Sequence, residues 1–200
     1  MMFALLDYRA SNMFSLAAAF KRLGVDTKIV TKDDKFDGYS AIILPGVGNF
    51  SSASEITSSC KRKIFACVEN GTPLLGICLG LQVLFERSEE GPGTGLTIFD
   101  GEVVKFPTSV KVPHMGWNQV VSSNDSVLLK DLNDEKWVYF AHSYYPKPKD
   151  ITTVKGTANY GVRFASVVEK EPIFGTQFHP EKSGVIGRSI LNNFVEYVRR

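Results

Sequence analysis

The sequence predicts an α/β fold, in which a mainly parallel β-sheet is flanked by helices and antiparallel strands are added in the second half. In the first half, short apolar runs alternate with stretches whose apolar residues recur at helical spacing. The second half consists of short β-rich segments separated by turn residues. Apolar residues make up 44% of the 200 residues, enough for one sizeable core. No linker or internal repeat divides the chain, so we expect a single domain over residues 1–200.

Strand and helix patterns alternate from the beginning of the chain. The apolar run Phe3–Leu6 is followed by a helical pattern over Asn12–Leu23, which Gly24 ends, and by the run Thr27–Val30. Units of this length predict parallel strands with helices on both faces of the sheet. The next expected elements are a strand at Ala41–Leu44, a helix ending at Glu69, a strand at Pro73–Ile77 and a helix at Leu79–Glu86.

The segments of the second half are short and rich in β-branched and aromatic residues, so we expect added antiparallel strands. Between the halves, Glu89–Gly95 holds three glycines and a proline, which predicts a flexible loop. The stretch Val185–Arg199 has one apolar side and predicts a helix packed on the sheet. The expected strands are Gly101–Phe106, Trp117–Val121, Trp137–Phe140, Ala165–Val168 and Ile173–Phe178.

Composition argues against several classes of protein. The 23 basic and 21 acidic side chains leave a formal net charge of +2, which provides no basic field for nucleic acid. The most apolar stretch, Leu74–Phe85, is too short to cross a bilayer, and Met1–Asp7 does not fit a secretory signal. The three cysteines do not suggest a disulfide framework, and no cysteines or histidines have metal-ligand spacing. We therefore expect a cytoplasmic protein without metal or cofactor, whose partners are a small molecule or a protein, not nucleic acid or membrane.

Cys78 stands where the sequence predicts a sharp turn from a strand into a helix. Glycines two residues before and two after it, in Gly76-Ile77-Cys78-Leu79-Gly80, permit such a turn. A helix N-terminus supplies partial positive charge and free N–H groups, which favour the thiolate. We therefore interpret Cys78 as a nucleophile; the alternative is a buried thiol that acts as a small apolar side chain. Cys60 and Cys67 share one face of an expected helix and are interpreted as core residues.

Acyl chemistry at a cysteine also needs a proton donor and acceptor, and His179 fits this role best. It follows the strand Ile173–Phe178, so it lies at the carboxyl end of a strand, as the cysteine does. Glu181 can project to the same side and hold the imidazole. The alternative is an exposed turn with an incidental ion pair. His142 and His114 are followed by no nearby carboxylate and are interpreted as a structural hydrogen-bond donor and a loop residue.

Two backbone N–H groups would stabilise the negative charge that acyl transfer places on oxygen. The N–H of Leu79, at the start of the predicted helix, is one candidate donor. The glycine-rich segment Pro45-Gly46-Val47-Gly48 follows the strand Ala41–Leu44 at the same edge of the sheet, and we choose the N–H of Val47 as the second donor. The alternative is an ordinary strand-to-helix turn, since a lone Gly-x-Gly is a weak signal.

The chain closely resembles class I glutamine amidotransferases in three motifs, which are Pro45-Gly46-Val47-Gly48, Gly76-Ile77-Cys78-Leu79-Gly80-Leu81-Gln82 and Phe178-His179-Pro180-Glu181. Three further stretches narrow the resemblance to the glutaminase subunit of imidazole glycerol phosphate synthase, and these are Pro113–Asn118, Ala141–Tyr145 and Glu181-Lys182-Ser183. The resemblance extends from Asp7 to the last helix and implies a flavodoxin-like α/β fold.

The resemblance implies hydrolysis of L-glutamine to glutamate and ammonia by a triad of Cys78, His179 and Glu181. The ammonia would pass to a barrel-shaped cyclase subunit, which makes imidazole glycerol phosphate in histidine biosynthesis. An amino-acid substrate needs an acid for its ammonium group and donors for its carboxylate. By matching position, the residues that would hold glutamine are Gly48, Gln82, Glu90, Ser143 and Tyr144. The alternative for Glu90 is a solvated loop charge.

The resemblance also places four consecutive residues against the cyclase, and these are Met115, Gly116, Trp117 and Asn118. Large aromatic residues dominate interface energetics, so we expect Trp117 to contribute at this contact or at the ammonia passage. The alternative is that Trp117 only packs beneath the antiparallel strands. One stretch departs from the family: Arg9-Ala10-Ser11 stands where a glycine-rich turn usually precedes an asparagine, here Asn12.

Three other functions compete with this one. A glutaminase serving another synthase would share the cysteine turn and the base, but the Pro113–Asn118 stretch argues against it. A catalytically silent interaction module on the same fold would not need an intact Cys78, His179 and Glu181. A cysteine peptidase is supported only by the fold and the nucleophile.

Overall fold

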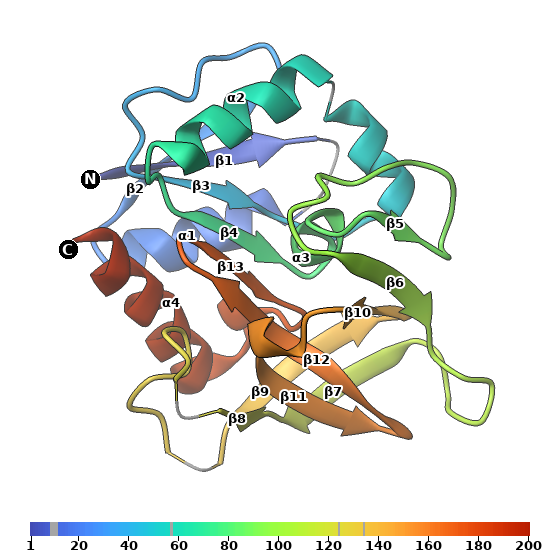
Figure 1. Ribbon diagram of the computed structural model, residues 1–200. Coiled ribbons are helices and arrows are strands. Elements are labelled where there is room, and N and C mark those ends of the chain that lie inside the picture. Colours follow the sequence, from blue (N-terminus) through green and yellow to red (C-terminus); the bar gives the residue numbers. More distant parts are fainter. Residues whose placement is uncertain (9–11, 57, 124, 134) are drawn as a thin grey trace.

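The largest element of the computed structural model is an eight-stranded sheet with the strand order β2-β1-β3-β4-β13-β12-β11-β8 (Figure 1). Two smaller sheets have the orders β10-β6-β5 and β7-β9. The structure describes residues 1–8, 12–56, 58–123, 125–133 and 135–200, so the departure at Arg9-Ala10-Ser11 lies outside the described residues.

The elements have the following bounds. The helices are α1 (Met13–Arg22), α2 (Ser58–Glu69), α3 (Leu79–Val83) and α4 (Gly184–Val198), with 3-10 turns η1 (Phe50–Glu55), η2 (Ile151–Thr153) and η3 (Pro180–Lys182). The strands are β1 (Met2–Asp7), β2 (Asp26–Thr31), β3 (Ala41–Leu44), β4 (Leu74–Ile77), β5 (Arg87–Ser88), β6 (Gly101–Lys105), β7 (His114–Gln119), β8 (Val121–Ser122), β9 (Trp137–His142), β10 (Tyr144–Pro148), β11 (Val154–Tyr160), β12 (Val162–Lys170) and β13 (Ile173–Thr176).

Five strands form the parallel half of the main sheet, which confirms the predicted fold class. β1 pairs in parallel with β2 and β3, β3 with β4, and β4 with β13. The prediction that the segment Ile173–Phe178 is one of the added antiparallel strands is wrong on this side, because Gly175 lies opposite Gly76 in a parallel pair. On its other side β13 pairs antiparallel with β12. It is therefore the strand at which the sheet changes direction.

Helices cover both faces of this parallel half, because side chains along a strand alternate between the faces. On one face, the Phe3 ring of β1 lies 5.2 Å from the ring of Phe20 in α1 and 5.8 Å from that of Phe194 in α4. On the other face, Leu6 belongs to the same buried cluster as Ile64 of α2. Figure 1 shows the corresponding layers, with α2 on one side of the sheet and α1 and α4 on the other. The last helix thus packs on the sheet as predicted.

Of two helices in the first half, α2 has the buried residues that were predicted, whereas α3 is shorter than predicted. In α2, Cys60 and Cys67 are both buried, which confirms them as core residues. In contrast, α3 ends at Val83 and not at Glu86 as predicted. The carbonyl oxygen of Val83 accepts a hydrogen bond from the N–H of Leu96 at 2.7 Å, so the returning loop takes the place of a further helical turn.

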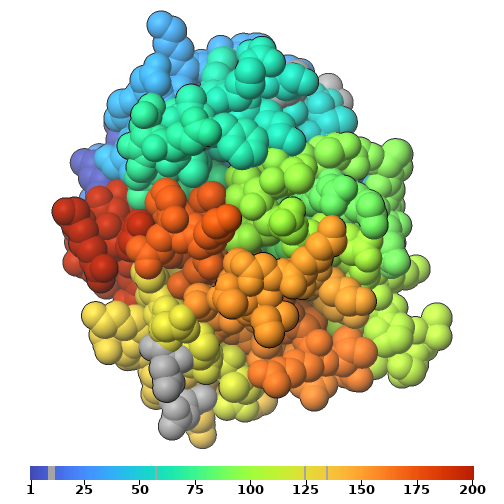
Figure 2. All heavy atoms as spheres, in the orientation of Figure 1, coloured from blue at the N-terminus to red at the C-terminus, as the bar shows by residue number. Residues whose placement is uncertain are grey.

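The second half adds antiparallel strands, as predicted, but also contains strands that the sequence pattern did not reveal. Residues 165–168 belong to the longer strand β12, which pairs antiparallel with β11. The strands β5, β10 and β11 were not predicted. In the space-filling view of Figure 2, the yellow and orange segments of this half form the lower part of the surface, beneath α2. Among the described residues, none of the helices combines the length and apolar character that crossing a bilayer requires.

Candidate active site

The predicted turn after β4 is centred on Cys78 itself. Its backbone has φ 53° and ψ −104°, which is a strained conformation for a residue with a side chain. The flanking glycines allow close packing. A Cβ on Gly80 would lie 1.9 Å from the carbonyl oxygen of Leu44, and one on Gly76 would lie 2.6 Å from the carbonyl oxygen of Gly80. Because α3 packs so closely on β3, the segment after β3 lies beside the cysteine.

His179 and Glu181 form a buried pair. The Nδ1 atom of His179 donates a hydrogen bond to Oε1 of Glu181 at 2.9 Å, and the two side chains are 1% and 0% exposed. Burial lowers the pKa of His179, but the negative charges of Cys78 and Glu181 outweigh this effect and raise the pKa to about 10. These interactions favour the protonated form of the imidazole. A side-chain hydrogen bond with Cys78 also contributes to this shift, and because Nδ1 is taken by Glu181, the Nε2 atom is the nitrogen that faces the cysteine.

Hydrogen bonds from other elements hold this pair in place. The N–H of His179 donates to the carbonyl of Tyr139 in β9 at 2.9 Å. The Ser183 hydroxyl donates to the carbonyl of His179 at 2.6 Å and accepts from the N–H of Tyr139 at 3.0 Å. The side-chain amide of Asn12 donates to Oε1 of Glu181. The ring of His179 is thus oriented by Glu181, and its backbone is held by β9.

Gln177 is a site residue that the sequence analysis missed. Its side chain is fully buried, and Nε2 lies within donating distance of the Cys78 sulfur, at 3.7 Å. Its Oε1 accepts from Nε2 of Gln82 at 3.1 Å. The side-chain amide of Gln177 therefore presents a donor to the sulfur of Cys78. A sequence signal did exist, since Gln177 stands two residues before His179 in the segment predicted to end a strand, and alternate residues of an extended chain face the same side.

A pocket opens at the cysteine and contains every residue predicted to hold glutamine. Both predicted oxyanion donors also lie on its wall. As the first residue of α3, Leu79 has an N–H without a helical acceptor. The lining residues are Val47, Gly48, Cys78, Leu79, Gln82, Glu90, Ala141, His142, Ser143 and Tyr144. Segments from β3, α3, the following loop and the β9–β10 turn are therefore brought together here.

The polar side chains of this pocket are partly engaged with the protein itself. Nε2 of Gln82 donates to the carbonyl of Tyr144 at 2.9 Å as well as to Gln177, so only its oxygen is left for a ligand. Oε2 of Glu90 accepts from the N–H of Phe50 at 2.7 Å. Burial raises the pKa of Glu90, and the bond from Phe50 lowers it in part. Glu90 is thus partly buried at the pocket and is not a fully solvated loop charge.

The stretch predicted to contact a partner lies outside this pocket, in β7. There Trp117 stands opposite Tyr139 of β9 in an antiparallel pair. Met115 is 65% exposed and Trp117 is 55% exposed, so neither is packed in the core. We call this antiparallel pair of β7 and β9 the exposed ribbon. Its residue Tyr139 accepts a hydrogen bond from the backbone N–H of His179. The role of the stretch as an interface stays a prediction.

The remaining histidines are both buried. The expectation that His114 is a loop residue is wrong, because it begins β7 and is 4% exposed. The strand begins three residues earlier than the predicted Trp117. His142 donates from Nδ1 to the carbonyl of Tyr144 at 2.8 Å, which agrees with its predicted role as a structural donor. Among the described residues, no group of three or more His, Cys, Asp or Glu side chains is arranged to hold a metal ion.

Comparison with known proteins places this site in a family. Residues 4–197 match the model of the family "Glutamine amidotransferase class-I". The chain belongs to this amidotransferase family. Its relatives include proteins named imidazole glycerol phosphate synthase subunit HisH. That of Methanothermobacter thermautotrophicus is 43% identical, with 99% of this chain and 100% of the relative covered, and that of Methanocaldococcus jannaschii is 45% identical, with 98% and 99% covered.

Solved structures share the fold of this chain. PurLQS from Thermotoga maritima matches with a TM-score of 0.77 and 21% identity, covering 98% of both chains. A glutamine amidotransferase from Thermotoga maritima matches with a TM-score of 0.67 and 14% identity, covering 100% of this chain and 84% of the other.

Proposed function

We propose that this chain, as a single domain over residues 1–200, hydrolyses L-glutamine to glutamate and ammonia and delivers the ammonia to a cyclase subunit of imidazole glycerol phosphate synthase in histidine biosynthesis. One observation carries the proposal. Cys78 stands on a strained turn at a pocket and is hydrogen-bonded to His179, which Glu181 holds from its other ring nitrogen. An acyl-transfer site has this composition and order of contacts.

The first half of the reaction forms a thioester. The Cys78 sulfur attacks the side-chain carboxamide carbon of glutamine, and the electron pair of the C=O bond moves to oxygen. The N–H groups of Leu79 and Val47 donate hydrogen bonds to this oxygen as its negative charge develops. His179 then gives its Nε2 proton to the nitrogen, the C–N bond breaks and ammonia leaves. The bond from Nδ1 to Glu181 keeps Nε2 as the nitrogen that exchanges protons.

The second half releases glutamate. His179, now neutral, takes a proton from water as the water oxygen adds to the thioester carbon. The C–S bond breaks, glutamate leaves, and Cys78 returns as a thiolate beside a protonated His179. One water molecule is consumed and one ammonia molecule is produced for each glutamine. Gln177 supports the thiolate at both ends of the cycle, because its amide donor faces the sulfur at 3.7 Å.

The pocket has the polar groups that an amino acid requires. The carboxylate of Glu90 and the free oxygen of Gln82 are acceptors for the α-ammonium group. The N–H groups and hydroxyls of the other lining residues are donors for the α-carboxylate, and these residues are Gly48, Ser143 and Tyr144. The match of residues 4–197 to the glutamine amidotransferase family supports glutamine as the substrate, and the relatives named HisH are described as subunits of a synthase.

The proposed partner is the cyclase subunit, which would contact the exposed ribbon at Met115, Gly116, Trp117 and Asn118. Two observations favour it over a different synthase. Relatives with the HisH name are 43% and 45% identical over nearly the whole chain, whereas the structure named PurLQS is 21% identical. The ribbon also exposes Met115 and Trp117, the kind of side chains that are enriched at protein interfaces.

A Cys78→Ala variant tests the nucleophile. In complex with the cyclase it should release no ammonia from glutamine, yet the complex should still form product from added ammonium salt, since the acceptor chemistry belongs to the other subunit. Cys67→Ala is the matched control, because it removes a buried thiol in α2 away from the pocket. Substantial glutamine turnover by Cys78→Ala would contradict the role of Cys78. Absence of ammonia release by the wild-type complex would contradict the proposed function as a whole.

A further inference from the structure

The proposed reaction does not use His114 or His142, yet the two buried rings form a hydrogen-bonded chain that ends at the glutamine pocket. Nδ1 of His142 lies 2.8 Å from the carbonyl oxygen of Tyr144, and Nε2 of the same ring lies 3.0 Å from Nδ1 of His114. Nε2 of His114 lies 3.3 Å from the side-chain nitrogen of Asn118. All four ring nitrogens therefore have a partner.

These contacts determine which nitrogen of each ring carries hydrogen. The carbonyl of Tyr144 can only accept, so His142 donates from Nδ1 and, as a neutral ring, accepts at Nε2. His114 must then donate from Nδ1 to His142 and accept at Nε2 from the amide of Asn118. Burial lowers the pKa of His142 to about 3 and that of His114 to about 4, so both rings are neutral near pH 7. A proton added to either ring would place two N–H groups face to face and break a link.

The inner end of the chain holds a backbone carbonyl of the pocket wall. The carbonyl of Tyr144 accepts from His142 on one side and from Nε2 of Gln82, at 2.9 Å, on the other. Ser143, between the two residues, has its own carbonyl bonded to the N–H of Phe106 at 3.2 Å. The turn His142-Ser143-Tyr144 therefore has a defined position in the pocket. A turn held in this way offers its N–H groups and side chains to a ligand without reorganisation.

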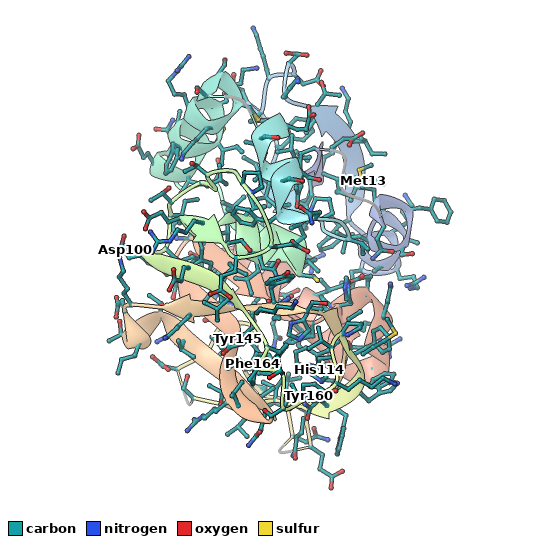
Figure 3. All side chains as sticks on the ribbon, turned by 90° about the vertical axis from the view of Figure 1, so that its right-hand side faces the viewer. Met13, Asp100, His114, Tyr145, Tyr160 and Phe164 are labelled. Atoms are coloured by element: carbon teal, nitrogen blue, oxygen red, sulfur yellow. The ribbon has the colours of Figure 1, made fainter. Side chains whose placement is uncertain are left out.

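Aromatic packing fixes the direction of the outer ring. His114 stacks on Tyr160 with a centroid distance of 4.0 Å and an interplanar angle of 20°, and on Phe140 at 4.8 Å and 24°. The ring of Phe106 packs against His114 in an edge-to-face contact with a centroid distance of 6.0 Å. Figure 3 shows His114, Tyr160, Phe164 and Tyr145 gathered in the lower half of the molecule. Because the plane of the ring is held, so is the direction of its Nδ1–H toward His142.

We propose that His114 and His142 are positioning residues for glutamine binding. The chain from Asn118 through His114 and His142 to the carbonyl of Tyr144 sets the place of the turn against which glutamine binds. This inference rests on the proposed function, since the ligand of the pocket is glutamine. It assigns to two residues outside the triad an effect on substrate affinity and not on the chemical step.

Two substitutions at His114 separate its hydrogen bond from its packing. His114→Phe keeps a ring between Tyr160 and Phe140 but removes the donor to His142. His114→Asn keeps a donor, because the asparagine Nδ2 atom can take the place of Nδ1, but removes the stacking. The two variants are compared with the wild type in complex with the cyclase by measuring KM and kcat for glutamine hydrolysis. Their thermal melting is measured in parallel.

The proposal predicts that the variant with the larger change in KM is not the variant with the larger fall in melting temperature. His114→Phe should raise KM by about 5- to 10-fold with kcat little changed, as expected for the loss of one hydrogen bond that supports binding. His114→Asn should keep KM near the wild-type value although its melting temperature falls further than that of His114→Phe. If KM instead follows the loss of thermal stability, or if neither variant changes KM, the positioning role is wrong.

Nitrogen NMR of the histidine rings provides a second test that does not depend on activity. Both His114 and His142 should be neutral with hydrogen on Nδ1 between pH 6 and 8. Hydrogen on Nε2, or a charged ring, at either residue overturns the chain. An active wild-type complex with the wrong tautomers rejects this inference alone. A wild-type complex that does not hydrolyse glutamine rejects the proposed function and this inference together.

Discussion

Replacing Gly80 with alanine should disturb the active site through the backbone. Gly80 is the second residue of α3, and an added Cβ would lie 1.9 Å from the carbonyl oxygen of Leu44 and 2.7 Å from its carbonyl carbon. Both atoms belong to the backbone of the buried central strand β3, so no rotation of a side chain relieves the overlap. To reach a tolerable contact, α3 and β3 must separate by about 1 Å.

The size of the effect follows from where this displacement occurs. Cys78 immediately precedes α3, and Val47 follows β3, so the nucleophile and one proposed oxyanion donor move apart. A misplacement of about 1 Å at reacting groups can lower the rate by about 10²-fold. Overpacking of a core costs about 1–3 kcal/mol of unfolding free energy. In a chain of this length each kcal/mol lowers the melting temperature by about 2–4 °C.

The assay compares ammonia release from glutamine by the Gly80→Ala and wild-type complexes, together with their thermal melting. Gly91→Ala is the matched control, because its Cβ would meet only the side-chain oxygen of Asn49, at an ordinary distance of 3.7 Å. The control makes the same chemical change and restricts the unfolded chain to the same extent. If Gly80→Ala hydrolyses glutamine and melts as Gly91→Ala does, the close packing of α3 on β3 does not control this site.

Three further perturbations test the triad, the ribbon and the buried histidines. His179→Ala should lower the rate of ammonia release by about 10²–10⁴-fold. Glu181→Ala should lower this rate less, because β9 still holds the backbone of His179. Equal losses of rate would show that Glu181 does more than orient the ring. Trp117→Ala should leave the melting of the isolated subunit nearly unchanged, since the side chain is 55% exposed, and weaken cyclase binding measured by titration; a large fall in stability would make it a packing residue. As pH falls below 6.5, the unfolded chain protonates His142 before the folded chain does, because the folded pKa is lowered to about 3. The free energy of unfolding should therefore fall by up to about 1.4 kcal/mol per pH unit because of this residue. In urea titrations, His142→Asn should lose less unfolding free energy between pH 7 and pH 5 than the wild type does. Equal losses in the two proteins would contradict a buried neutral ring at His142.

The sequence alone determined the features that depend on local spacing. The apolar period of 3.6 or 2 residues located the elements of the parallel half, and the glycines on either side of Cys78 located its turn. The positions of Cys78 and His179 at strand ends followed from the same patterns, because the carboxyl ends of parallel strands meet at one edge of a sheet. Short motifs then identified the family, which the comparisons confirmed.

The tertiary structure alone decided which groups of distant segments meet. An apolar strand has the same sequence pattern whether its neighbour is parallel or antiparallel. The direction of β13 relative to β4 and β12 could therefore not be predicted from Ile173–Phe178. Gln177 and Cys78 are 99 positions apart, and the hydrogen bond between them exists only because β13 pairs with β4. The chain from His114 to His142 likewise depends on the β7–β9 pair, where these residues stand opposite each other. Hydrogen bonds between strands are set by register, and register is a property of the packed sheet and not of either strand.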